Sequence, residues 1–278
     1  MSDSGNSLVP KIKTLITKYI NFTPLDVHWL PYSTKLVTIG ESFDSKGVLH
    51  IYNLIRGRLN LEYEYIQDYP SKCCSFGISS FASRDLALGD FEGNLSVIDL
   101  ERGVSNFKIQ KAHKGRIQTM DGLGIKNNIG PPEVATGGKD GIVKIWDLRT
   151  DKPSIILEPK DIQKNFPECW TVSYGGIENK DVKNPVYKKL YVENKTQLWG
   201  AKFLPQEKNM FVSLGGNGSL NLYKFEKSDF IDNNKEKLKI INSCRLSSLP
   251  IIGFDWHFIK TDLACLVSLD NSIRICNL

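Results

Sequence analysis

Five stretches of this chain repeat one pattern, in which a turn residue is followed by a short alternating run, a polar residue and a large apolar one. The stretches are Gly47–Leu54, Gly93–Leu100, Gly141–Leu148, Gly218–Phe225 and Asn271–Leu278. Alternation of apolar and polar residues indicates a half-buried β-strand. A repeat of long period constrains the fold more than any single residue does, because each repeat supplies one unit of the same architecture.

The spacing of the repeats predicts the architecture. The turn positions 47, 93, 141, 218 and 271 are separated by 46, 48, 77 and 53 residues. Three of these gaps match one β-propeller blade, about 40–45 residues in common repeats, lengthened by loops. The gap of 77 is too long for one blade and too short for two. We therefore expect an all-β propeller with an irregular stretch between its third and fourth units.

Two further apolar strands precede each turn. Second strands are expected at 36–39, 86–88, 133–136, 210–214 and 263–267, and first strands at 25–29, 73–76, 117–120, 198–203 and 251–256. With a less regular fourth strand, each unit reaches the strand count of a propeller blade. The five turn pairs tolerate the positive φ angles of tight hairpins; they are Lys46-Gly47, Glu92-Gly93, Asp140-Gly141, Asn217-Gly218 and Asp270-Asn271.

The length of 278 residues suits one large all-β domain or two ordinary ones, and the even repeat favours one. We expect a disordered N-terminus at residues 1–10 and a single domain at 11–278, with an irregular junction at 175–195. No apolar run approaches the ~20 residues that cross a bilayer. The polar start lacks a signal-peptide core, and we expect a cytoplasmic, monomeric protein without contact to membranes.

The six cysteines form no Cys-x-x-Cys pair, and most lie in apolar strands. We interpret them as reduced, buried small hydrophobes. The net charge is +5, and the one basic concentration is Lys180–Lys202, with six lysines. It is either a solvated loop or a patch for an acidic partner or nucleic acid. No arginine cluster or aromatic ladder accompanies it, so we expect no nucleic-acid partner.

The third unit carries the clearest motif. It contains Ala112-His113, then Thr136-Gly-Gly-Lys-Asp140, then Ile145-Trp146-Asp147, and it resembles a WD-repeat blade. That resemblance implies a buried hydrogen-bonded network of His113, Thr136, Asp140 and Trp146. A buried carboxylate needs such partners. The alternative to this structural role is that His113 and Asp140 form a catalytic dyad.

The other four units lack the full set. Their residues at the Trp146 position are Tyr52, Ile98, Tyr223 and Cys276, and the turn Asp is replaced in three of them. We therefore expect apolar packing and ladder hydrogen bonds alone to hold these blades.

A more specific resemblance runs through the chain in order. It is carried by Phe22–Pro31, Gly89–Leu95, Cys169–Tyr174 and Trp199–Pro205. These segments resemble the Monad-type WD-repeat family, also known as a dynein axonemal assembly factor. The resemblance implies a seven-bladed propeller without enzymatic activity. It also implies work with the prefoldin-like co-chaperone machinery that contains the RuvB-like ATPases, in cytoplasmic assembly of axonemal dynein heavy chains.

The chain departs from this family at Gly175–Asn194, where a short stretch replaces roughly one and a half blades. Five blades are then complete, and Cys169–Tyr174 is the first strand of a degenerate sixth that also includes Val186–Val192. Lys11–Ile20 alternates over most of its length. We expect it to pair with the last unit as its outer strand, because a propeller avoids exposed strand edges.

Motifs for chemistry are missing from the linear sequence. The four histidines show no zinc spacing, and there is no phosphate loop or Gly-x-Ser-x-Gly. We expect no enzyme, cofactor or metal. Trp29, Trp170, Trp199 and Trp256 lie in first strands and are expected to pack in the core. The loops entering these strands are a candidate partner surface, or else ordinary exposed polar loops; the candidates are Lys72, His113, Lys114, Arg116, Glu168, Trp170, Gln197 and Trp199.

Three functions remain open at this point. The first is a non-catalytic co-chaperone scaffold for dynein, and the resemblance supplies its partners, the RuvB-like/prefoldin-like assembly and axonemal dynein chains. The second is a general WD-repeat adaptor, such as a ligase substrate receptor or a histone-tail reader. The third is a propeller hydrolase with a carboxylate or metal cluster at its centre. Fold alone does not choose among them.

Overall fold

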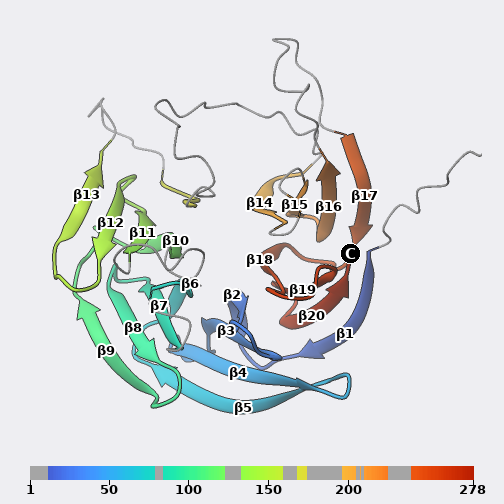
Figure 1. The fold of residues 1–278 in the computed structure, drawn as a ribbon, viewed down its shortest axis with the longest axis horizontal. Helices are drawn as coiled ribbons and strands as arrows, with labels where there is room; N and C mark the ends of the chain where they lie inside the picture. The colour runs from blue at the N-terminus through green and yellow to red at the C-terminus, as the bar shows by residue number, and fades with distance from the viewer. Residues whose placement is uncertain are drawn as a thin grey trace, which may run out of the picture. The chain divides into compact units, whose positions relative to one another are not determined.

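The computed structural model in Figure 1 describes residues 12–78, 84–122, 133–158, 168–173, 196–204, 207, 210–224 and 239–278. The regular elements in these ranges are twenty β-strands. No helix in them is long and apolar enough to cross a membrane. The segments 1–10 and 175–195, predicted to be disordered and irregular, lie outside the described residues, as does Val186–Val192.

The chain divides into two compact units, Ile20–Pro185 and Met1–Tyr19 with Val186–Leu278. The first unit holds three antiparallel four-stranded sheets in the orders β2-β3-β4-β5, β6-β7-β8-β9 and β10-β11-β12-β13. Their strands are β2 (Thr23–Trp29), β3 (Lys35–Glu41), β4 (Gly47–Ile55), β5 (Arg58–Gln67), β6 (Ser71–Ser75), β7 (Asp85–Asp90), β8 (Leu95–Asp99), β9 (Val104–Ile109), β10 (Ile117–Gly122), β11 (Glu133–Gly138), β12 (Val143–Asp147) and β13 (Pro153–Leu157).

The second unit holds two sheets, in the orders β14-β15-β16-β17 and β1-β20-β19-β18. Their strands are β14 (Leu198–Phe203), β15 (Met210–Gly215), β16 (Ser219–Lys224), β17 (Lys239–Arg245), β18 (Ile251–Trp256), β19 (Leu263–Ser268), β20 (Ser272–Asn277) and β1 (Lys13–Tyr19). All five sheets have the strand order of a propeller blade. The predicted fold class, an all-β propeller with five complete blades, is confirmed.

The tight turns explain why the chain reverses direction between two strands at these positions. Gly93, Gly141, Gly218 and Asn271 have φ angles of 83°, 73°, 79° and 57°, so four of the five predicted turn residues adopt the left-handed conformation. At the first turn the prediction is wrong, because Ser45 takes that conformation with a φ of 59°. The loop there is longer, and its residue Ser42 pairs with Lys46 through the Ser42 N–H and the Lys46 carbonyl, 3.0 Å apart.

The core lies between neighbouring sheets. One apolar cluster joins the first two blades and includes Ile39, Leu49 and Leu88, all fully buried. A second joins the blades of β6–β9 and β10–β13 around Ile117. A third, in the other unit, packs Val212 and Leu222 against Phe254. Each blade is therefore stabilised by the sheet beside it, as expected of stacked repeats.

The N-terminal strand β1 completes the last blade. It pairs antiparallel with β20, from Lys13 opposite Asn277 to Tyr19 opposite Ser272 (Figure 1). The predicted outer strand is thus confirmed for its described part. Ile12, just before β1, is 5% exposed and belongs to the core of this unit. The strand therefore contributes a ladder of hydrogen bonds and an apolar anchor.

We expect Ile12→Ala to lower the free energy of unfolding by about 2–5 kcal/mol, because it removes a buried side chain and leaves a cavity. Urea denaturation followed by circular dichroism measures the effect. Leu15→Ala is the matched control, since Leu15 is 51% exposed on the same segment. Equal stability of the two variants would contradict the anchoring role of Ile12.

Candidate functional site

The structure brings His113, Thr136, Asp140 and Trp146 together in the third blade. Nδ1 of His113 lies 3.0 Å from Oδ1 of Asp140, and its Nε2 lies 2.8 Å from Oγ1 of Thr136. The indole N–H of Trp146 donates to the same Oγ1 at 2.8 Å. These contacts connect the loop before β10, the strand β11, the β11–β12 turn and the strand β12.

The partners fix the protonation of His113. A carboxylate only accepts, so Nδ1 carries the proton and donates to Asp140, and Nε2 accepts from the Thr136 hydroxyl. The His113 side chain is fully buried and that of Asp140 is 8% exposed. A general base needs a free nitrogen within reach of substrate. Nε2 is occupied by Thr136 and shielded from solvent, so this geometry is that of a structural clamp.

Burial acts on both titrating groups of the clamp. Burial lowers the pKa of His113, although the adjacent Asp140 partly opposes the shift. Burial also disfavours the charged form of Asp140, but hydrogen bonds from the Lys114 N–H and from His113 prevail and hold its pKa below the usual 3.8. At neutral pH the clamp is therefore a neutral imidazole beside an ionised carboxylate.

The last blade has a clamp of different composition. The guanidinium of Arg274 donates to Oδ2 of Asp270 at 2.6 Å and to Oγ of Ser268 at 2.7 Å. Oγ of Ser247 donates to Asp270 at 2.9 Å. Although Asp270 is partly buried, these donors, Arg274 first, hold the pKa of its carboxyl far below the usual range. For this blade, the expectation that apolar packing and ladder hydrogen bonds alone hold the blades without the full motif is wrong.

Two further blades carry buried polar contacts at the position equivalent to Arg274. In the first blade, His50 lies 2.9 Å from the Tyr52 hydroxyl and 2.9 Å from Oε1 of Glu64. In the fourth, the Ser243 hydroxyl donates to Oδ1 of Asn221 at 2.5 Å. In these three blades, the strand after the tight turn thus places a polar side chain among apolar ones and satisfies it locally.

Residues 169–173, the described part of the predicted first strand of a sixth blade, lie alongside β10 but form no regular β-ladder with it. The Arg116 guanidinium donates to Glu168 at 3.3 Å, and the Val172 N–H donates to Oγ1 of Thr119 at 3.2 Å. Ser173 donates to Asp121 at 3.0 Å. Residues 168–173 therefore run parallel to β10, but largely through side chains. Tyr174 lies outside the described residues.

Exposure divides the four tryptophans of the predicted first strands into two pairs. Trp29 and Trp256 are 4% and 5% exposed, as core packing predicts. Trp170 and Trp199 are 62% and 41% exposed, so the expectation of core packing is wrong for them. Exposed indole rings are unusual on a protein surface and are typical of interface anchors.

The remaining candidate surface residues are divided between the two units. Lys72 is half-buried in β6, Lys114 is exposed, and Arg116 and Glu168 form the half-buried ion pair described above. His113 is buried and belongs to the clamp. Gln197 and Trp199 lie in the other unit at the start of β14, where both are exposed.

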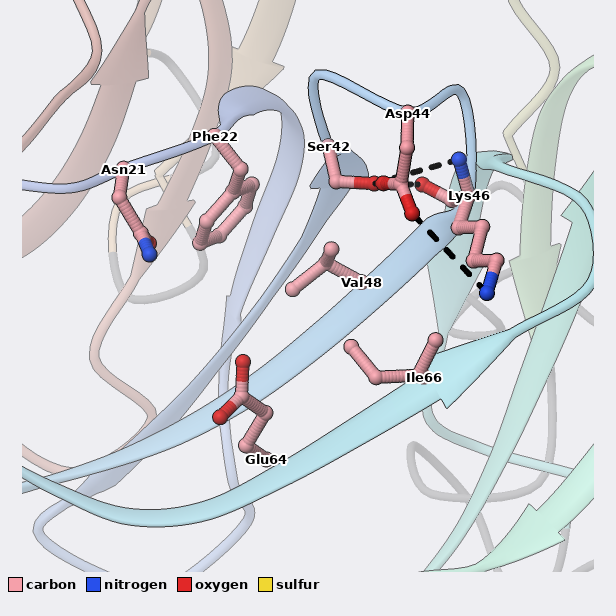
Figure 2. Close-up of a pocket in the computed structure, with 8 residues that line it drawn as sticks. All are labelled: Asn21, Phe22, Ser42, Asp44, Lys46, Val48, Glu64 and Ile66. Carbon is pink, nitrogen blue, oxygen red and sulfur yellow. Dashed lines mark hydrogen bonds and ion pairs between the residues drawn. The ribbon is translucent and has the colours of Figure 1, made fainter.

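A cavity of about 220 Å³ lies on the first blade (Figure 2). Its walls are Asn21, Phe22, Ser42, Asp44, Lys46, Val48, Glu64 and Ile66. Figure 2 shows Asp44 between Ser42 and Lys46 above the cavity, with Glu64 rising from β5 on the opposite side. The Ser42 hydroxyl lowers the pKa of Asp44. The cavity is smaller than the usual 300–1,000 Å³ of ligand pockets.

The cysteines have no disulfide partner in the described residues, and four of the six are buried. Burial raises the pKa of the Cys276 thiol to about 11 and that of Cys73 further. A raised thiol pKa disfavours the nucleophilic thiolate. Both thiols are therefore inert at neutral pH and pack as small apolar groups.

The chain is similar along nearly its whole length to proteins named dynein axonemal assembly factor 10. The proteins from Xenopus laevis, Homo sapiens and Chlamydomonas reinhardtii are each 29% identical, over 96% of this chain and 96% of their own. No family model matches the chain. The resemblance expected from the sequence is confirmed by these similarities.

The aligned length bears on the missing blades. The alignments extend over 343, 345 and 344 positions, whereas this chain has 278 residues. The similar proteins therefore carry residues at many positions where this chain has none. This difference agrees with the expected loss of about one and a half blades.

We expect Thr136→Val to lower the free energy of unfolding by about 1–3 kcal/mol, because the isosteric change leaves His113 Nε2 and the Trp146 N–H without a partner. Chemical denaturation measures it. Thr136→Ser keeps the hydroxyl and should recover most of the loss. Thr150→Val, on an exposed turn, is the matched control. If Thr136→Val matched the control in stability, the clamp would have no energetic role.

We expect Asp140→Asn to destabilise the protein most at neutral pH. The pKa of Asp140 is lowered by folding, so its stabilisation is present above its ordinary pKa of 3.8 and is lost as pH falls through the lower folded value. The difference in unfolding free energy between wild type and Asp140→Asn should therefore shrink toward about pH 3. Urea titrations across this pH range test it, and a difference that grows on acidification would refute the assignment.

Proposed function

We propose that this protein is a non-catalytic interaction scaffold that takes part in the assembly of axonemal dynein. The similarity over 96% of the chain to proteins named dynein axonemal assembly factor 10, from vertebrates and an alga, carries the proposal. Five blades of short antiparallel sheets hold loops in fixed positions, and preorganised loops bind partners at low entropic cost. The mechanism is binding, with no bond made or broken.

In the finer form of the proposal, the protein is a cytoplasmic co-chaperone adaptor. Its partners are the RuvB-like/prefoldin-like assembly and axonemal dynein chains, and it acts as a monomer. The resemblance noted in the sequence supports these partners. The alignments over 96% of the chain support the dynein part of the proposal, because the similar proteins are named for axonemal dynein assembly.

The candidate contact surface centres on Trp170. Trp170 is 62% exposed and follows two residues after Glu168, which pairs with Arg116. The exposed Lys114 precedes Arg116 by two residues. An exposed aromatic ring with charged neighbours is the usual composition of an interface hot spot with a polar rim. In the other unit, Trp199 and Gln197 are further candidates.

Affinity purification of the tagged full chain from ciliated cells, followed by mass spectrometry, tests the proposal. Recovery of RuvB-like ATPases or dynein heavy chains supports the co-chaperone role. Consistent recovery of ligase subunits or histones without them would favour the general WD-repeat adaptor and overturn the proposal.

We expect Trp170→Ala to weaken capture of these partners by at least about 10-fold, since buried tryptophan anchors contribute more than about 1.4 kcal/mol. Its stability should change by less than about 0.5 kcal/mol, because the ring is exposed. Phe43→Ala is the control, as Phe43 is 90% exposed on the β3–β4 loop. Equal capture by both variants would remove Trp170 from the binding surface.

A further inference from the structure

Three side chains of different chemistry converge between the first two blades. Asp26 and His28 are on β2, and Cys74 is on β6. Nε2 of His28 lies 3.3 Å from Oδ2 of Asp26, and Sγ of Cys74 lies 3.9 Å from the same oxygen. The three candidate ligand atoms, one from each residue, all lie within 4.8 Å of one another. We propose that Asp26, His28 and Cys74 form a zinc-binding site.

Two of the three separations between ligand atoms are close to those of tetrahedral zinc, and the third, between His28 Nε2 and Cys74 Sγ, is no longer than 4.8 Å. Bonds of 2.0–2.2 Å to oxygen and nitrogen and of 2.3 Å to sulfur place neighbouring ligand atoms roughly 3.3–3.6 Å apart. The observed separation of Asp26 Oδ2 and His28 Nε2 is 3.3 Å, and the thiol needs to approach the carboxylate by only a few tenths of an ångström. Carboxylate, imidazole and thiolate are all ligands that zinc accepts.

The backbone holds these ligands in place. Alternate residues of a strand share a face, so Asp26 and His28 project together. The N–H of Val27 donates to Oδ1 of Asp26 at 2.9 Å, which leaves Oδ2 directed at the cluster. The N–H of Cys74 donates to Oδ2 at 3.2 Å. Ligating carboxylates are commonly supported by such outer hydrogen bonds.

The surroundings permit an ion to enter. Cys74 is 1% exposed and lies within the apolar cluster between the blades. The side chains of His28 and Asp26 are 13% and 19% exposed, so one side of the cluster is open to solvent. Three protein ligands with one open side leave the fourth position for water. The buried thiol is shielded from solvent, which disfavours the alternative of a nucleophilic cysteine.

A bound ion would add a connection between the inner strands of two blades that already meet through apolar packing and through the hydrogen bond from the Cys74 N–H to Asp26. Because the ligands come from β2 and β6, zinc would be bound by the folded form and would stabilise it. The linear spacing of the histidines gave no signal for this site. The pattern Asp26-x-His28 on one strand was visible, but Cys74 joins it only through the packing of neighbouring blades.

Zinc titration of the purified, chelator-stripped full chain tests the site. We expect about one equivalent of Zn²⁺ to bind. His28→Ala and Cys74→Ala should each weaken binding by more than about 100-fold, since even outer-shell changes cost 10–100-fold. Cys73→Ala is the control, because the Cys73 thiol is directed instead at the Ile117 carbonyl, 3.7 Å away, and this variant should bind Zn²⁺ as wild type does.

Cobalt(II) provides a second readout that does not depend on stability. Co²⁺ bound to a thiolate gives a sulfur-to-metal charge-transfer band, which should appear in wild type and Cys73→Ala and vanish in Cys74→Ala. His28→Asn supplies a milder variant if His28→Ala fails to fold. Wild-type protein that binds no equivalent of Zn²⁺, or variants of His28 and Cys74 that bind it like wild type, would overturn the proposal.

Discussion

Packing between neighbouring sheets is the constraint on which the rest of this structure depends. Each blade has two faces, and the apolar clusters lie between blades rather than within one. A single four-stranded sheet cannot bury both of its faces alone, so the blades are stable only when they are stacked against one another. The alternation along β3 and β4, which directs Ile39 and Leu49 to the neighbouring blade, converts the sequence repeat into this arrangement.

Polar clamps add specificity to that packing. The apolar clusters fix how closely two blades approach, whereas His113 with Asp140 and Arg274 with Asp270 connect turns to strands within one blade. Each clamp contains a carboxylate whose hydrogen bonds keep it ionised in spite of burial. Two blades reach the same result with different residues, so the requirement is a satisfied acidic turn rather than one fixed set of side chains.

The sequence was sufficient for the features that depend on local periodicity. The strands and four of the five turns follow from alternation and from residues that accept positive φ, and the four clamp residues of the third blade follow from their motif. Features that depend on contacts distant in the sequence were missed. Ser268, Asp270, Ser272 and Arg274 alternate visibly along one hairpin, yet only the pairing of β19 with β20 shows that they meet. The exposure of Trp170 and Trp199 depends on what packs against these residues, which periodicity does not report.

The pairing of β1 with β20 has a consequence for biosynthesis. Thr14 and Cys276, which meet in this sheet, are separated by 262 positions in the chain. On the ribosome, β1 emerges early and must wait as an unsatisfied edge until residues 272–277 have been made. Contacts of such long sequence separation slow folding and leave strands available for wrong partners. A nascent chain of this design would therefore itself be a client for chaperones before it could serve any assembly reaction.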